Sequence, residues 1–248
     1  MSETNVIRVS RAMPKPRFLL AVLACCLIAA LVFASTGNFE RTYTPQGQTH
    51  LTITNADGDI NLTAWQKKSL TVRAVTDPGV SIEDQVSGND IAITVKSAPP
   101  VGKATFEVSV PAETSVSINN LKGKIDIKGV TGHIRVNSID SHVRLANIRS
   151  QAVDVKVTTG DIFFDGALHA SGSYSLQSVK GDIDVSLPAG TSFNLVARAL
   201  SENINLGEFL TNLTGAIRGT KGISGTHLRG GPKLTLITYD GRVLLHKK

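Results

Sequence analysis

The chain of 248 residues has only two cysteines, Cys25 and Cys26, and both lie near the N-terminus. The rest of the chain therefore has no thiol for a disulfide, a cysteine-ligated zinc site or a nucleophilic cysteine. Aromatic residues make up only 5% of the chain, and methionine is absent after Met13. A charged content of 19% is close enough to average to argue against a disordered chain.

Strong charge of one sign is also missing once the net charge of +6 is divided along the chain. Residues 1–34 hold four basic residues and one acid, which gives +3, and residues 35–248 hold 22 basic and 19 acidic residues, which gives the other +3. The main part of the chain is therefore nearly balanced, and its basic end, His246 to Lys248, is short. This distribution does not favour a nucleic-acid partner.

An apolar run from Phe18 to Ala34 is the longest in the chain. As a helix its 17 residues would extend about 26 Å, the short end of the range for crossing a bilayer. Basic residues precede it, which predicts a cytoplasmic N-terminus and an exported C-terminal part. We expect a single-pass signal-anchor at 18–34 behind a basic arm at 1–17. A signal peptide cleaved after Ala34 is the alternative.

Residues 35–48 are polar and are expected to form a linker, which leaves 49–248 as one domain. In that domain short segments of alternating apolar and polar residues are separated by turn residues, which is the pattern of β-strands. One unit, Gly or Ser followed by x-Ile/Val-x-apolar, recurs. Its copies begin at Gly58, Gly123, Gly132, Ser141, Gly160 and Gly181, with a weaker copy at Glu202.

The repeat separates into two ladders of apolar positions with identical steps of 18, 19, 21 and 21 residues. One ladder is Ile125, Val143, Ile162, Ile183 and Ile204, and the other is Val116, Ile134, Val153, Tyr174 and Leu195. Equal steps are expected if each coil supplies one strand to each of two sheets. The sequence therefore predicts an all-β fold, a parallel β-helix-like solenoid with coils of about 20 residues.

Outward-facing charges provide an independent test of this register. The register places Asp126 beside Arg144 and Arg135 beside Asp154, and opposite charges on neighbouring strands stabilise a sheet. Residues 49–110 carry a less regular version of the same rhythm. Their apolar pairs are Leu51/Ile53, Ile60/Leu62, Leu70/Val72, Ile91/Ile93 and Phe106/Val108.

Three segments resemble a bacterial family of β-strand-repeat proteins labelled putative adhesins, a domain of unknown function. They are the opening segment 51–60, the Val-Pro-Ala-x-Thr-Ser step at 110–115, and the closing segment 230–243. The resemblance covers about residues 49–248. It implies a protein of the bacterial cell envelope in which no catalytic residues are established.

Asp161, Asp182 and Asp184 are the candidate site residues of the repeat. The ladder makes Asp161 and Asp182 stacked neighbours, with Asn203 next and Asp184 on the same outer face. Paired carboxylates of this kind could bind a cation or serve a retaining glycosidase. The alternative is that the Gly-Asp pair serves only to form the turn at the start of each strand, since both residues suit turns. We therefore assign no metal ligand.

Other motifs of catalysis or cofactor binding are absent. The sequence has no Ser-His-Asp arrangement, phosphate-binding loop or dinucleotide fingerprint. His133 and His142 are nine residues apart and are expected on different sheets, so they would not share a metal. We therefore expect no enzyme activity, no catalytic residue and no cofactor.

The sequence thus predicts an anchored β-solenoid that binds or scaffolds, with its C-terminal domain on the periplasmic or extracellular side. Residues 18–34 would contact the membrane, and envelope proteins or glycans are the expected partners. Two alternatives stay open. One is a carbohydrate-active enzyme that uses the face of Asp161, Asp182 and Asp184, and the other is an envelope-stress sensor or its regulatory partner.

Overall fold

The structure is a computed structural model that describes residues 37–98, 101–201 and 203–248. The predicted arm at 1–17 and the predicted membrane segment at 18–34 lie outside the described residues. Within the described ranges, no helix is both long and apolar enough to cross a membrane.

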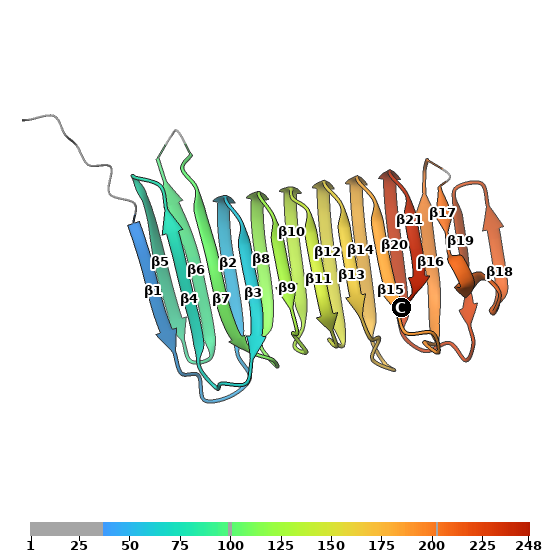
Figure 1. The fold of residues 1–248 in the computed structure, drawn as a ribbon, viewed down its shortest axis with the longest axis horizontal. Helices are drawn as coiled ribbons and strands as arrows, with labels where there is room; N and C mark the ends of the chain where they lie inside the picture. Colours follow the sequence, from blue (N-terminus) through green and yellow to red (C-terminus); the bar gives the residue numbers. More distant parts are fainter. Residues whose placement is uncertain (1–36, 99–100, 202) are drawn as a thin grey trace, which may run out of the picture. The chain divides into compact units, whose positions relative to one another are not determined.

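The described residues form two sheets, here called sheet A and sheet B (Figure 1). Sheet A has ten strands in the spatial order β1-β4-β7-β3-β9-β11-β13-β15-β21-β17, and sheet B has eleven in the order β18-β19-β16-β20-β14-β12-β10-β8-β2-β6-β5. The strands of sheet A are β1 (Gly37–Tyr43), β3 (Ile60–Trp65), β4 (Leu70–Thr76), β7 (Ala104–Pro111), β9 (Ile125–Lys128), β11 (Val143–Ile148), β13 (Ile162–Gly166), β15 (Ile183–Leu187), β17 (Ile204–Asn205) and β21 (Val243–Lys247). Those of sheet B are β2 (His50–Asp57), β5 (Val80–Ser87), β6 (Asp90–Ser97), β8 (Ser115–Lys122), β10 (Ile134–Asp140), β12 (Ala152–Thr159), β14 (Ser173–Lys180), β16 (Phe193–Ala199), β18 (Leu213–Gly219), β19 (Gly222–His227) and β20 (Lys233–Asp240). A 3₁₀ helix, η1 (Gly207–Leu210), follows β17.

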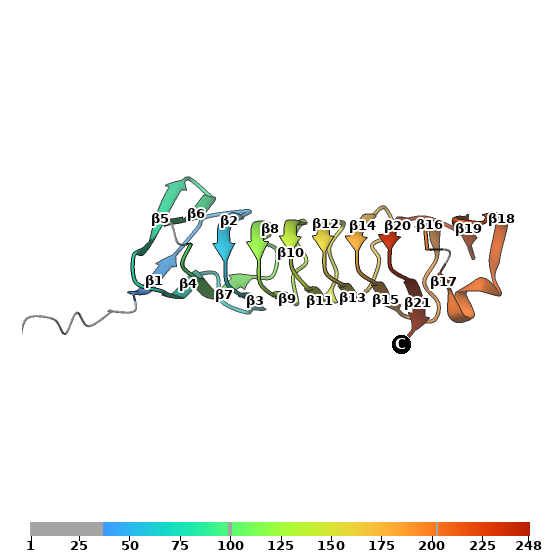
Figure 2. The same ribbon diagram turned by 90° about the horizontal axis from the view of Figure 1, so that it is seen from above.

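The central part of the fold is a stack of coils. In each coil a strand of sheet B leads into a strand of sheet A, and both strands pair in parallel with those of the next coil. Figure 2 shows the two sheets as layers that face each other. This arrangement confirms the all-β fold and the parallel stacking that the repeat predicts.

The first four positions of both predicted ladders are confirmed. In sheet A, neighbouring strands align Ile125, Val143, Ile162 and Ile183. In sheet B they align Val116, Ile134, Val153 and Tyr174. The charge test also holds, because Asp126 is in register with Arg144 and Arg135 with Asp154. Period-two alternation thus buries one side of each strand and leaves the other in solvent.

The prediction for the fifth position of each ladder is wrong. The last coil of the chain, β20–β21, lies between the coils β14–β15 and β16–β17. Val243 therefore pairs with Ile183 and Leu234 with Tyr174. The predicted partners, Ile204 and Leu195, lie on the far side of the inserted coil.

At the other end of the stack, too, the spatial order of the coils differs from their order in the chain. The coil β2–β3 lies between β6–β7 and β8–β9, although β6 and β7 follow it in the chain. Leu51 is in register with both Ile91 and Val116. Both inserted coils have other coils on either side of them, and their apolar pairs are buried.

Glycines at one corner of the stack allow the coils to approach closely. Gly160 has a φ of +129°, and a Cβ there would lie 2.1 Å from the carbonyl oxygen of Ser141. Gly181 and Gly241 repeat this contact against Gly160 and Gly181. A side chain at such a corner would force neighbouring coils apart, which explains the glycine in the repeat.

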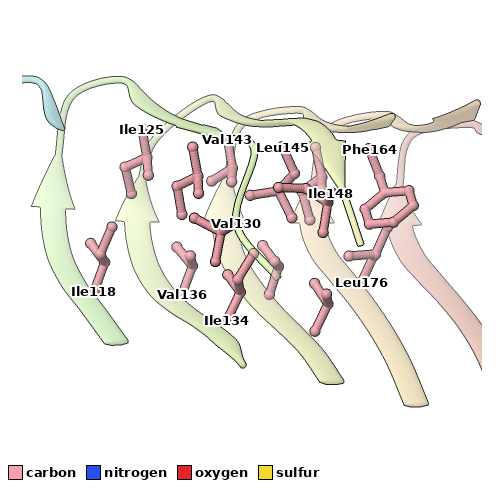
Figure 3. Close-up of a cluster of buried hydrophobic side chains, with 14 of the residues drawn as sticks. Ile118, Ile125, Val130, Ile134, Val136, Val143, Leu145, Ile148, Phe164 and Leu176 are labelled. Carbon is pink, nitrogen blue, oxygen red and sulfur yellow. The ribbon is translucent and has the colours of Figure 1, made fainter. Parts of the chain in front are cut away.

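The space between the sheets is filled by aliphatic side chains, as Figure 3 shows for its central part. Ile118 and Val136 project from sheet B, and Ile125 and Val143 project from sheet A. Each is at most 2% exposed, so each contributes about 1.5–3 kcal/mol by the burial of its side chain. The low aromatic content suits this narrow core.

Antiparallel strands flank the parallel stack at both ends. β4 pairs with β7, β5 with β6 and β19 with β16, all antiparallel. The polar segment that the sequence assigns to a linker contributes one of the edge strands, because Gly37–Tyr43 forms β1 on the outer side of β4. Its polar composition fits an exposed edge strand as well as a linker.

Candidate functional site

The structure places Asp161 and Asp182 side by side at the corner of the stack, as the repeat predicts. Asp161 Oδ1 accepts a hydrogen bond of 2.8 Å from the backbone N–H of Asp182. The next neighbour differs from the prediction: it is Arg242, from the inserted last coil, and not Asn203. The corner aspartates therefore accept hydrogen bonds from one coil to the next.

Asp182 is engaged by a cation of the protein itself. Its Oδ1 accepts the backbone N–H of Arg242 at 2.8 Å, and its Oδ2 accepts from Nε at 3.0 Å and from Nη2 at 2.6 Å. The hydrogen bonds and positive charge of Arg242 lower the pKa of Asp182. Asp182 is thus held as a carboxylate that pairs with a guanidinium.

Asp184 lies two residues farther along, on the outer face of β15. Its Oδ1 lies 3.3 Å from His246 Nδ1, and the residue is in register with Phe163 on β13. The three candidate aspartates therefore divide into a corner pair and one carboxylate on the face of the sheet. Among the described residues, no group of three or more His, Cys, Asp or Glu side chains is arranged to hold a metal ion.

The outer face of sheet A carries a recess of about 440 Å³ around an exposed aromatic ring. The ring belongs to Phe163, which is 44% exposed and in register with Arg144 on one side and Asp184 on the other. Asp126 and His246 also line the recess. An apolar surface is thus surrounded by side chains of both charges on the strands from β9 to β21.

The outer face of sheet B carries a different feature, a line of mostly apolar side chains across successive coils. We call this line the apolar row. In the order of the strands from β2 to β16 it consists of Ala56, Leu121, Ile139, Thr158, Val179, Tyr239 and Leu200. Five of these side chains, at 121, 139, 179, 200 and 239, are 41–54% exposed.

Polar residues precede and follow the apolar row along the strands. The next residue of each strand, toward the corner of the stack, belongs to a mostly charged row that alternation turns away from the outer face: Asp57, Lys122, Asp140, Thr159, Lys180 and Asp240. On the other side, Asn137 donates a hydrogen bond of 3.2 Å to Asn119 and lies beside Lys156. A shallow groove of about 550 Å³ follows the apolar row, and Asn119, Asn137 and Lys156 line it on the side away from the corner.

Neither Phe163 nor the apolar row is among the residues predicted from the sequence. The signal for the row is nevertheless present, because five of its seven members lie five positions after a member of the sheet B ladder. Leu121, Ile139, Thr158 and Val179 repeat the steps of 18, 19 and 21 residues. Period two assigns these positions to the outer face, where a recurring apolar residue indicates an interaction surface.

The sequence matches the family described as Toastrack DUF4097 twice, over residues 48–169 and over residues 114–245. The chain belongs to the Toastrack DUF4097 family. This confirms the resemblance to a β-strand-repeat family of unknown function. The two Toastrack matches overlap, as expected when a family pattern recurs along a stack of similar coils.

Two solved structures similar to this Toastrack chain carry adhesion in their descriptions. A "putative cell adhesion protein" from Clostridium sporogenes is 11% identical, covers 86% of this chain and 100% of its own, and has a TM-score of 0.50. A "putative adhesin" from Bacteroides fragilis is 13% identical, covers 87% of this chain and 99% of its own, and has a TM-score of 0.42. The first similarity supports the fold. No curated protein matches the sequence.

Proposed function

We propose that this Toastrack protein is an exported binding module of the adhesin type, which binds a linear glycan on sheet A without catalysis. Residues 18–34 would hold it in the bacterial cell membrane, with the β-domain outside the cytoplasm. The observation that carries the proposal is Phe163, an exposed ring set among charged side chains on an otherwise regular sheet. The similar fold of the "putative cell adhesion protein" from Clostridium sporogenes points in the same direction.

The chemistry around Phe163 suits a sugar. A sugar ring has an apolar face that can lie on an aromatic ring, and hydroxyl groups at its rim that need hydrogen-bond partners. Arg144 and Asp184 flank the ring in register and supply a donor and an acceptor. The recess is open and crosses several strands, so it fits one stretch of a polymer better than a small enclosed ligand.

The electrostatics of the corner aspartates support binding without hydrolysis. A glycosidase needs one carboxyl group whose pKa is raised, so that it can act as a general acid. The pKa of Asp182 is instead lowered by Arg242. Asp161 is engaged by the backbone of the next coil. These contacts give the aspartates a role in stacking the coils, and we assign them no catalytic step.

The test is a binding titration of the full chain, purified in detergent, against linear bacterial polysaccharides selected from a printed array. We expect Phe163→Ala to weaken binding at least tenfold, because it removes the apolar platform. Tyr239→Ala is the matched control, since Tyr239 is an exposed aromatic residue on the opposite sheet.

Two results would contradict the proposal. One is the absence of binding to any glycan on the array, and the other is equal binding by the Phe163→Ala variant and the unaltered chain. Cleavage of a bound glycan that is lost on replacing Asp161 or Asp182 would instead establish the enzyme alternative.

A further inference from the structure

We infer that the glycan bound on sheet A is acidic, and that Arg144 binds its acid group beside the sugar that lies on Phe163. The inference rests on the proposed function, because it concerns the same recess and names the class of glycan that the recess selects. It is carried by the charges around the ring and by the partners that each of these charges has within the chain.

Arg144 lies on β11, one strand from Phe163, and both side chains are exposed in the same outward-facing row of sheet A. Neighbouring strands are about 4.8 Å apart, so a group carried by a sugar on the ring is within reach of the guanidinium. None of the cation–π contacts found among the described residues joins Arg144 to Phe163. The ring face and the guanidinium are therefore both available to a ligand.

Arg144 differs from two other arginines on this side of the molecule in having no acidic partner. Arg73 on β4 pairs with Glu40 at 2.8 Å, and Arg242 pairs with Asp182 at 2.6 Å. Among the residues that the structure describes, no carboxylate oxygen lies within 4.0 Å of a nitrogen of Arg144. A guanidinium is a planar fork of donors that matches an oxyanion such as a carboxylate, so Arg144 can bind such a group on a ligand.

Two of the three carboxylates that line the recess already have a basic partner. Asp184 Oδ1 lies 3.3 Å from His246 Nδ1, and Asp165 pairs with Lys248. A carboxylate with a positive partner at this distance repels an approaching anion less than a lone carboxylate does. These two aspartates therefore do not bar an acidic ligand from the recess.

The remaining charges of the recess are two cations and one acid. Lys124, Arg144 and Asp126 line it, and none of the three has an ion pair in the described part of the chain. Asp126 is in register with Arg144 on the side away from Phe163. Two cations less one acid leave one unpaired positive charge, with the histidines counted as neutral. The recess therefore favours a polymer with acid groups over a neutral one.

The shape of the recess allows one polymer to contact the ring and the cations together. Its lining comes from β9, β11, β13, β15 and β21, which extend about 19 Å at roughly 4.8 Å per strand. A polymer that lies across the strands places successive sugars over successive coils. One sugar then lies on Phe163 on β13, while acid groups of the same polymer lie near Arg144 and Lys124 on the two preceding coils.

An array of matched polysaccharides, probed with the full chain in detergent, tests the inference. Polygalacturonate and alginate are each printed beside their carboxyl-reduced forms, and dextran sulfate is printed beside dextran, so the pairs separate carboxylate from sulfate. Only binding that Phe163→Ala weakens is counted, because attraction to the basic arm at 1–17 would persist in that variant. We expect at least one acidic polymer to bind on the order of tenfold more tightly than its neutral counterpart.

Three variants locate the source of this preference. Arg144→Gln should reduce the preference to about onefold, because it removes the charge-assisted contact. Arg73→Gln is the matched control and should keep the preference, since Arg73 is an exposed arginine of the same sheet that already has an acidic partner. Asp126→Asn should strengthen the binding of acidic polymers about threefold, because it removes the unpaired acid beside Arg144. Thermal melts verify that each variant folds.

The inference fails if neutral polymers bind through Phe163 as tightly as their acidic counterparts, if Arg144→Gln keeps the preference, or if Arg73→Gln loses it equally. In each of these cases sheet A still binds a glycan and the proposed function stands. If no polymer shows binding that Phe163→Ala weakens, the proposed function is itself contradicted, and this inference fails with it.

Discussion

Replacing Gly160 by alanine should destabilise the stack far more than the same change at a loop glycine. Gly160 has a φ of +129°, and an added Cβ would lie 2.1 Å from the carbonyl oxygen of Ser141. The left-handed backbone alone costs about 1–2 kcal/mol for alanine. Relief of the clash must also separate two coils at the corner, where the N–H of Ser141 donates to the carbonyl oxygen of Thr159 and that of Val143 to the carbonyl oxygen of Asp161.

Two weakened hydrogen bonds at about 0.5–1.5 kcal/mol each bring the expected loss to about 2–5 kcal/mol. Two other glycines separate the contributions. Gly88 has a φ of +60° and no heavy atom within 4 Å of an added Cβ, so Gly88→Ala should cost only about 1–2 kcal/mol. Gly190 has neither feature, so Gly190→Ala should change stability by less than about 0.5 kcal/mol.

Urea unfolding of the three variants, followed by circular dichroism, measures these differences. The reasoning predicts a graded order, with Gly160→Ala least stable, then Gly88→Ala, then Gly190→Ala. Equal midpoints for Gly160→Ala and Gly88→Ala would show that close coil contact at the corner is not a constraint, and would refute the argument.

Three further predictions concern the core, the corner and the first strand. Ile162→Ala should lower the free energy of unfolding in urea by about 2–5 kcal/mol, because the side chain is buried. Phe163→Ala should lower it by less than about 0.5 kcal/mol, because that side chain is exposed. Similar losses for the two variants would contradict the alternation of inward and outward side chains. The lowered pKa of Asp182 means that its pairing stabilises the fold above the usual value of 3.8, and that this stability is lost as pH falls through the lowered folded-state pKa. Arg242→Gln should therefore reduce stability at neutral pH and flatten its acid dependence, and an unchanged pH profile would count against the pair. Tyr43→Phe should accelerate amide hydrogen exchange in β1, because Tyr43 Oη donates a 2.8 Å hydrogen bond to Asp84 on β5; unchanged exchange would show that this link does not hold the edge strand.

The regular part of the fold could be predicted because its determinants are local. Alternation decides which side chains face inward, and equal steps in the two ladders decide which strands are neighbours. Ile125 to Ile183 and Val116 to Tyr174 follow both rules.

The inserted coils could not be predicted from equal steps, since both ladders satisfy that rule in either order. From Ile183 to Val243 and from Tyr174 to Leu234 the step is 60 residues in each sheet. A better signal is the corner glycine. Gly241 stands where close stacking on Gly181 requires glycine, whereas the weaker repeat has Glu202 at that position in the sequence. Within the stack Ser141 is an exception, because it holds the corner position that is glycine in the neighbouring coils.

The candidate site, like the fold, could be predicted from the sequence only in part. The neighbouring positions of Asp161 and Asp182 follow from the repeat, but the partner of Asp182 does not, because Arg242 arrives from a coil 60 residues away in the chain. Phe163 gave no periodic signal as a binding residue. The apolar row did follow the ladder steps, and outward-facing positions deserve the same scrutiny as inward-facing ones in a repeat of this kind.

The most direct test of the proposed function is a quantitative glycan-binding measurement on three forms of the full chain: unaltered, Phe163→Ala and Tyr239→Ala. Binding of a linear bacterial polysaccharide should be weakened at least tenfold by Phe163→Ala and retained per chain by Tyr239→Ala. If the unaltered chain binds no such glycan, or if Phe163→Ala binds as tightly as the unaltered chain, the assignment of sheet A as a glycan-binding face is wrong.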